Sequence, residues 1–188
     1  MNKFKKICSA LAVSICFVLA LVSCKSVSFY DEWHEAGATI EEDNCFKLLT
    51  VDEVVAKRDA KESFVIFIGA SAIQTTTNSK AVDLVSAIQA EADAVNYTSK
   101  VYFVNAKEAM LSLSQQKDMK DKLKINEIND SYGLVCVSYI NGDVYFDTST
   151  IKGNNIPDQL KRFVVDDSNE ISFKALANYV FENYPVTE

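Results

Sequence analysis

The stretch ESFVIFIGASAIQTTT, residues 62–77, decides the fold of this 188-residue chain. Its first part, residues 63–69 (SFVIFIG), is apolar and rich in β-branched and aromatic side chains, which is typical of a central strand buried on both faces. Gly69 ends that run, and Thr77 or Asn78 can cap a following helix in which apolar side chains recur at helical spacing. The stretch is therefore predicted to be a strand, a short loop and the start of a long helix.

Strand and helix patterns alternate on either side of this stretch. The predicted strands are 45–50, 63–69, 100–105, 134–140 and 143–147, and the predicted helices are 51–61, the one that runs to about Asn96, 113–125, a short one after Pro157, and a last one that starts at Ser168 or Ser172. Asn141-Gly142 is a strong hairpin signal, because both turn positions need positive φ. The predicted fold class is α/β, with a mixed central sheet, a late β-hairpin and a C-terminal helix.

Composition and charge exclude several function classes. The chain is 48% hydrophobic and 24% charged, which is typical of a globular protein rather than a disordered one. Its net charge is −7, and no run of Lys or Arg beyond the N-terminus supplies the basic patch that nucleic-acid binding needs. His34 is the single histidine, so a zinc site is not expected. The sequence predicts no cofactor, no metal and no nucleic-acid partner.

The N-terminus has the pattern of a targeting segment. Three lysines precede an apolar run over residues 7–22, and Leu21-Val22-Ser23-Cys24 follows. The run is shorter than the roughly 20 residues that span a bilayer. The segment resembles a bacterial lipoprotein signal peptide, whose lipobox ends in the cysteine that is acylated after cleavage. The resemblance implies that residues 1–23 are removed and that Cys24 carries the lipid.

The residues after Cys24 are predicted to be a tether. Residues 24–44 are mostly polar, and as a coil they would span roughly 25 Å. Phe29, Tyr30 and Trp33 either dock on the domain or lie at the lipid interface, where such rings are favoured. His34 is predicted to be exposed. The folded domain is predicted at 45–188, and the protein is expected in the bacterial cell envelope, on the outer membrane or the periplasmic face of the inner membrane.

The element order, with the hairpin late and a helix last, resembles the thioredoxin-like family over about residues 46–184. The local match is closest to bacteriocin transport accessory-type proteins, through Glu62-Ser63-Phe64 before the strand, Ile68-Gly69 at its end, and the hairpin 139–144, YINGDV. The resemblance implies a three-layer sandwich. It also implies a sheet with the strands in the order first, third, second, fourth, fifth.

Both redox hallmarks of that family are absent. The resemblance places the Cys-x-x-Cys motif at Ala72-Ile73-Gln74-Thr75 and the cis-proline near Leu134, yet none of these residues is a cysteine or a proline. The thiolate is the nucleophile in disulfide exchange, and neither Ala nor Thr replaces it. The expected function is therefore not enzymatic: a redox-inactive, membrane-anchored domain that acts as a binding or scaffold module.

Two further cysteines leave an alternative open. In the implied sheet order, three strand spacings separate Cys45 from Cys136, roughly 14 Å. A disulfide needs Cα atoms within about 7 Å, so both are predicted to be buried thiols. The alternative function is a thiol-disulfide accessory protein that uses Cys136, or a partner's cysteine.

The predicted contact surface is the groove between residues 70–77 and the loop before Leu134. Ser71, Thr76 and Thr77 supply hydroxyls there, next to a helix N-terminus that can hold an anion. The simpler interpretation is that one of them caps the helix and the rest are solvated. The expected partners are the membrane, through the lipid, and an unknown envelope protein or peptide. A third hypothesis is an acidic surface that docks a basic partner.

Overall fold

The computed structural model of the protein is an α/β domain. It describes residues 28–71, 79–97, 100–107, 109, 112–128, 133–151, 155–165 and 170–184. The predicted signal peptide and lipid site, Cys24, lie outside the described residues, as do Ala72, Ile73, Gln74, Thr75, Thr76 and Thr77. None of the described helices combines the length and the apolar character that crossing a bilayer requires.

A mixed sheet of five strands forms the centre of the domain. The strands are β1 (Phe46–Leu48), β2 (Phe64–Gly69), β3 (Val101–Asn105), β4 (Val135–Ile140) and β5 (Asp143–Asp147). Their order is β1-β3-β2-β4-β5; the first three are parallel, and β4 and β5 are antiparallel to their neighbours. The predicted strand order and the predicted mixed sheet are confirmed.

The hairpin between β4 and β5 forms as predicted. Asn141 has φ 52° and Gly142 has φ 81°, the pair of positive values that a type I′ turn requires. The turn also packs against the end of a helix, because a Cβ at Gly142 would lie 2.2 Å from the carbonyl oxygen of Arg58. Glycine is therefore needed here for both its conformation and its size.

Five α-helices are present in the described part of the chain. They are α2 (Phe29–Glu35), α3 (Val51–Asp59), α4 (Ser79–Ala94), α5 (Leu113–Leu123) and α6 (Phe173–Asn183). Thr50 caps α3 in a capping box with Glu53, and of the two predicted starts of the last helix Ser172, rather than Ser168, is its cap. The short helix predicted after Pro157 is a single 3-10 turn, Lys161–Phe163. A small unpredicted hairpin follows it, made of β6 (Val164–Val165) and β7 (Glu170–Ile171).

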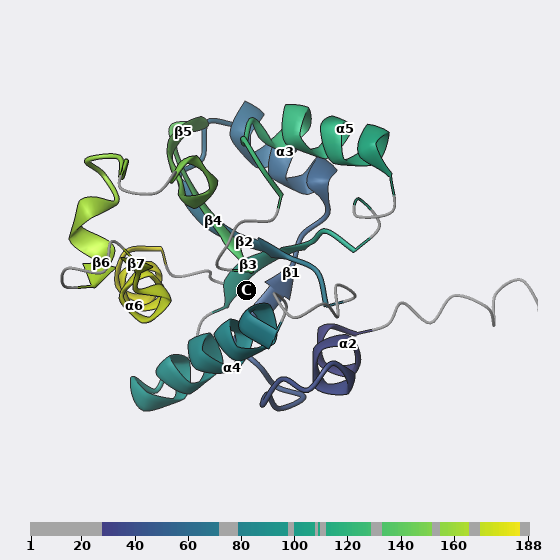
Figure 1. Cartoon of the computed structure of the whole chain (residues 1–188), viewed down its shortest axis with the longest axis vertical. Coiled ribbons are helices and arrows are strands. Elements are labelled where there is room, and N and C mark those ends of the chain that lie inside the picture. Colours follow the sequence, from purple (N-terminus) through teal and green to yellow (C-terminus); the bar gives the residue numbers. More distant parts are fainter. Residues whose placement is uncertain are drawn as a thin grey trace, which may run out of the picture.

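The helices cover both faces of the sheet and make three layers (Figure 1). One apolar core joins the sheet to α2, α4 and α6, and a second core joins it to α3 and α5. Alternate side chains of β2 supply the two cores: Val65 and Phe67 face the first, and Phe64, Ile66 and Ile68 face the second. All six residues of β2 are buried, as its continuous apolar run predicts.

The prediction that residues 24–44 form a tether is wrong from Ser28 onward. Ser28 caps α2 in a capping box with Asp31, and Phe29 and Trp33, one turn apart, are buried. The Trp33 ring meets Phe103 of β3 edge-on, with centroids 5.4 Å apart. A helix of seven residues is marginal alone, so burial of its aromatic face holds it in place. The folded domain therefore includes the described residues from Ser28 onward, and the docking alternative for the aromatic residues is the correct one. His34 is exposed, as predicted.

Candidate functional site

The topology marks one place on the sheet as a natural binding site. β1 and β3 continue into α3 and α5 on one face, whereas β2 continues toward α4 on the other. The adjacent strands β2 and β3 thus send their connections to opposite faces. In α/β sheets a crevice opens at the carboxyl ends of such a strand pair, and ligands bind there.

A buried carboxylate lies at these carboxyl ends. Glu32 of α2 accepts hydrogen bonds from Asn105 Nδ2, at 2.6 Å, and from the hydroxyl of Ser71. Lys107 Nζ lies 3.6 Å from Glu32 Oε1, and the Glu32 side chain is only 10% exposed. We call these four residues the carboxyl-end cluster. Burying a charge is costly unless donors compensate it, and here three side chains do so.

The cluster is built by the ends of three elements. Asn105 is the last residue of β3, and its side-chain oxygen accepts from the backbone N–H of Lys107 at 2.9 Å, which fixes the orientation of its amide. Ser71 follows β2 by two residues. Glu32 reaches Asn105 and Ser71 because the ring contacts of Phe29 and Trp33 with β3 hold α2 against the sheet. Sequence reasoning missed Glu32 because it assigned α2 to the tether; the signal available was the Ser28–Asp31 cap followed by aromatic residues four apart.

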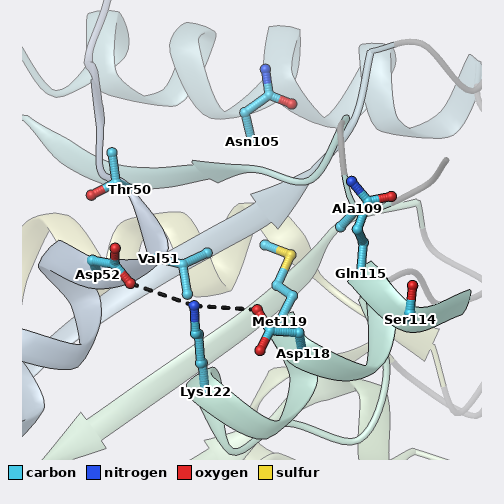
Figure 2. A pocket seen from close by; sticks show the side chains of 10 residues that line it. All are labelled: Thr50, Val51, Asp52, Asn105, Ala109, Ser114, Gln115, Asp118, Met119 and Lys122. Atoms are coloured by element: carbon cyan, nitrogen blue, oxygen red, sulfur yellow. Dashed lines mark ion pairs between the residues drawn. The ribbon is translucent and has the colours of Figure 1, made fainter. Parts of the chain in front are cut away.

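Asn105 also lines a groove between α3 and α5 (Figure 2). The groove has a volume of about 500 Å³ and is lined by Thr50, Val51, Asp52, Asn105, Ala109, Ser114, Gln115, Asp118, Met119 and Lys122. We call it the α3–α5 groove. A second hollow of about 330 Å³ adjoins it and shares Thr50, Val51 and Asn105 with it. Asn105 therefore links the groove to the carboxyl-end cluster.

The groove has an apolar base and a charged rim. Met119 and Ala109 are buried, whereas Lys122 lies on the rim between Asp118, at 3.2 Å, and Asp52, at 3.7 Å. One lysine thus faces two exposed carboxylates. Nearby, the backbone N–H and the hydroxyl of Thr50 donate to Glu53 and hold its pKa below the usual range. The rim therefore carries an excess of negative charge, which favours a basic partner.

The structure places two of the predicted contact residues near each other but in different environments. Ser71 belongs to the carboxyl-end cluster. Leu134 lies beside Gly69, where an added Cβ would meet its side chain at 2.3 Å, yet Leu134 is completely buried. Leu134 is therefore a core residue, and its prediction as a contact residue is wrong. It directly precedes β4 and continues the buried run of that strand. Gly133, directly before it, does lie against α4, since a Cβ at Gly133 would be 2.7 Å from the backbone nitrogen of Ala81.

The two cysteines of the folded domain are thiols in the core, as predicted. Cys136 is fully buried in β4, and Cys45, just before β1, is 5% exposed. Both face the α4 and α6 side, with β3 and β2 between them in the sheet. Burial raises the pKa of Cys45 to about 12, so this thiol stays protonated at neutral pH and is a poor nucleophile.

In the described part of the chain, the cluster and the groove bring no imidazole next to a hydroxyl. Ser71 donates to a carboxylate, but no imidazole lies beside it: the single histidine, His34, is exposed and stacks on Tyr30 with centroids 4.8 Å apart. Within the described residues, no three His, Cys, Asp or Glu side chains are grouped to hold a metal. No protein-family model matches this chain, and no curated protein does either. The described side chains offer hydrogen bonds, charge and an apolar base, all of which can contribute to binding.

Proposed function

We propose that this protein is a lipid-anchored protein of the bacterial envelope whose thioredoxin-like domain has lost its redox site and serves as a binding or scaffold module. The observation that carries this proposal is the carboxyl-end cluster. In the family it resembles, the redox loop follows the strand that corresponds to β2. Here Ser71, at the start of that loop, is bound to the Glu32 carboxylate. The sheet order β1-β3-β2-β4-β5 supports the same family.

The binding role is supported by the groove that Asn105 connects to the cluster. Its apolar base is made by Met119, and polar and charged groups surround it. Binding sites commonly combine an apolar lining with a few placed polar groups. The acidic rim suits a partner segment that carries a basic side chain beside an apolar one. We propose an envelope protein or peptide as that partner.

The alternative is a thiol-disulfide accessory protein, and the position of the thiols weighs against it. Cys136 lies in the middle of the sheet with no exposed surface. Disulfide exchange requires in-line attack by a thiolate that the substrate can reach. Cys136 would have to be uncovered by unfolding of β4 before it could react.

Reduction of insulin disulfides by dithiothreitol separates the two functions. We expect the wild-type protein and the Cys136→Ala variant to leave the reduction rate at that of the buffer control. Activity in the wild type that disappears in Cys136→Ala, but not in Cys45→Ala, would refute the binding-module proposal. Incorporation of labelled palmitate, with Cys24→Ala as the control, tests the anchor separately.

A further inference from the structure

The folded domain begins very close to the proposed lipid. Ser28 already caps α2, so only residues 25–27 separate the domain from Cys24. Whatever their conformation, the four Cα–Cα steps from Cys24 to Ser28 span at most about 14 Å. A twenty-residue coil would have let the domain turn freely, whereas this connection does not. The inference below rests on the proposed lipid anchor.

We propose that the side of the domain that carries α2 is its membrane-facing side, held within a short distance of the lipid headgroups, while α3 and α5 point away from the bilayer. The acyl chains attach at Cys24, so the start of α2 cannot leave the membrane surface by more than the short connection allows. The helices α3 and α5 cover the opposite face of the sheet (Figure 1). Rotation that brought α5 to the membrane would place the body of the domain between Ser28 and its own anchor.

Surface charge is not what keeps the α2 side near the lipid. Asp31, Glu42 and Asp43 are exposed around Ser28. Among the described residues, Lys100 is a cation near Ser28, and it is bound to Asp43 at 2.9 Å and to the carbonyl of Asn44 at 2.6 Å. Bilayers with anionic lipids attract basic segments and repel acidic ones. The covalent connection, and not adsorption, therefore keeps this side close to the membrane.

The orientation also places the carboxyl-end cluster near the bilayer. The backbone N–H of Glu32 donates to the carbonyl of Ser28 at 3.1 Å, so Glu32 lies one helical turn from the start of the domain. Adding one turn and one side chain to the connection puts the cluster within about 25 Å of the Cα of Cys24. A partner that binds at the cluster must reach this height above the lipid, which fits the extramembrane part of a membrane-embedded protein.

Energy transfer to labelled lipid measures the orientation in the full, lipidated protein. A donor dye is attached at Glu35→Cys on α2 or at Lys117→Cys on α5, both exposed positions, while Cys45 and Cys136 are buried. The protein is placed in vesicles of phosphatidylethanolamine and phosphatidylglycerol that contain a headgroup acceptor. The two sites lie in outer layers on opposite faces of the sheet, roughly 20 Å apart across the domain. We expect clearly higher transfer from position 35 than from position 117.

A lengthened connection is the matched control. Twenty Gly and Ser residues inserted between Val27 and Ser28 add a coil of about 25 Å, and the difference between the two positions should then largely disappear. Equal transfer from positions 35 and 117 in lipidated protein with the native connection would overturn the orientation alone. A mass spectrum without the lipid at Cys24 would overturn the anchor, and the orientation with it.

Discussion

The two sides of the sheet differ in the side chains that fill their cores and in where the thiols lie. On the side of α2, α4 and α6, aromatic rings from Phe29, Trp33, Phe46 and Phe103 stack on one another, and both thiols lie in the same core. On the side of α3 and α5 the core is mainly aliphatic, and the α3–α5 groove opens between the two helices. We call the side of α2, α4 and α6 the closed side, because both thiols are buried in its core, and the other side the open side, because the α3–α5 groove lies there. A hollow of about 470 Å³ also lies beside α2, but neither cysteine lines it. This separation is the physical basis for proposing binding rather than redox chemistry.

The largest effect on stability is expected from a substitution in the core of the closed side. Trp33→Ala removes a completely buried ring, and we expect it to lower the free energy of unfolding by about 3–5 kcal/mol. The neighbouring change His34→Ala removes an exposed ring and should stay within about 0.5 kcal/mol. Chemical denaturation compares the two. A small effect for Trp33→Ala would show that α2 is not part of the folded domain.

That prediction concerns the element that sequence reasoning misjudged. The strands could be predicted because a strand buried on both faces must be apolar throughout, as 63–69 is, and the hairpin because Asn-Gly suits two positive φ values. Helix α2 was harder to predict, because apart from the cap at Ser28 its acids Asp31, Glu32 and Glu35 mask an apolar face of only two residues, Phe29 and Trp33. Seven residues are too few for a clear helical period.

The candidate site was predictable only in part. The position of Ser71 follows from the strand that precedes it. The carboxylate it binds comes from Glu32, 39 residues earlier, and Asn105 is 73 residues from Glu32. A sequence without an alignment carries no signal that joins such distant residues. Leu134 was misjudged for a related reason: its place beside Gly69 was foreseen, but not that the α2 side of the sheet would cover it.

The next largest effect on the free energy of unfolding is expected at Glu32, the carboxylate of the carboxyl-end cluster. Glu32→Gln keeps the shape of the side chain but removes its charge and leaves one acceptor oxygen for its three donors. Hydrogen bonds to charged groups contribute about 1.5–3 kcal/mol, and we expect a loss of stability of that size. The matched control is Glu35→Gln on the same helix, where the side chain is exposed. If both variants unfold alike, Glu32 is not held by the cluster.

A smaller effect should appear at alkaline pH, on the closed side. Burial raises the pKa of Cys45 to about 12, whereas a cysteine in an unfolded chain titrates near about 8.5. Between these values the native state keeps a proton that the unfolded state loses, so the free energy of unfolding falls as pH rises. The contribution is complete below about pH 8.5 and shrinks by at most about 1.4 kcal/mol per pH unit above it.

Denaturation of wild type and Cys45→Ala at pH 8 and pH 10 measures this contribution. We expect the wild type to lose about 1–2 kcal/mol more than the variant over this interval. Burial raises the pKa of Tyr139 as well, but that group is present in both proteins and cancels in the comparison. An identical pH dependence would mean that Cys45 is accessible to water.

The smallest effect is expected on the open side. Thr50→Ala removes the hydroxyl that caps α3 and donates to Glu53, whereas the backbone N–H of residue 50 can still donate to that carboxylate. A lost N-cap costs about 1 kcal/mol. Thr39→Ala, at an exposed residue, is the control and should change stability by less than about 0.5 kcal/mol. A carboxyl titration of Glu53 followed by NMR should show its lowered pKa rise only in part in Thr50→Ala, because the backbone N–H of residue 50, the larger cause of the lowering, remains.

Photo-crosslinking in intact cells tests most directly whether the open side is the binding surface. A photoreactive residue is placed at Gln115, in the α3–α5 groove, or at Tyr145, which is 41% exposed on β5 at the opposite edge of the sheet. We expect a discrete crosslinked protein from position 115 that is lost when Asp118→Lys reverses a charge of the rim, and none from position 145. Equal crosslinking from both positions, or a product from position 115 that Asp118→Lys leaves unchanged, would contradict that expectation.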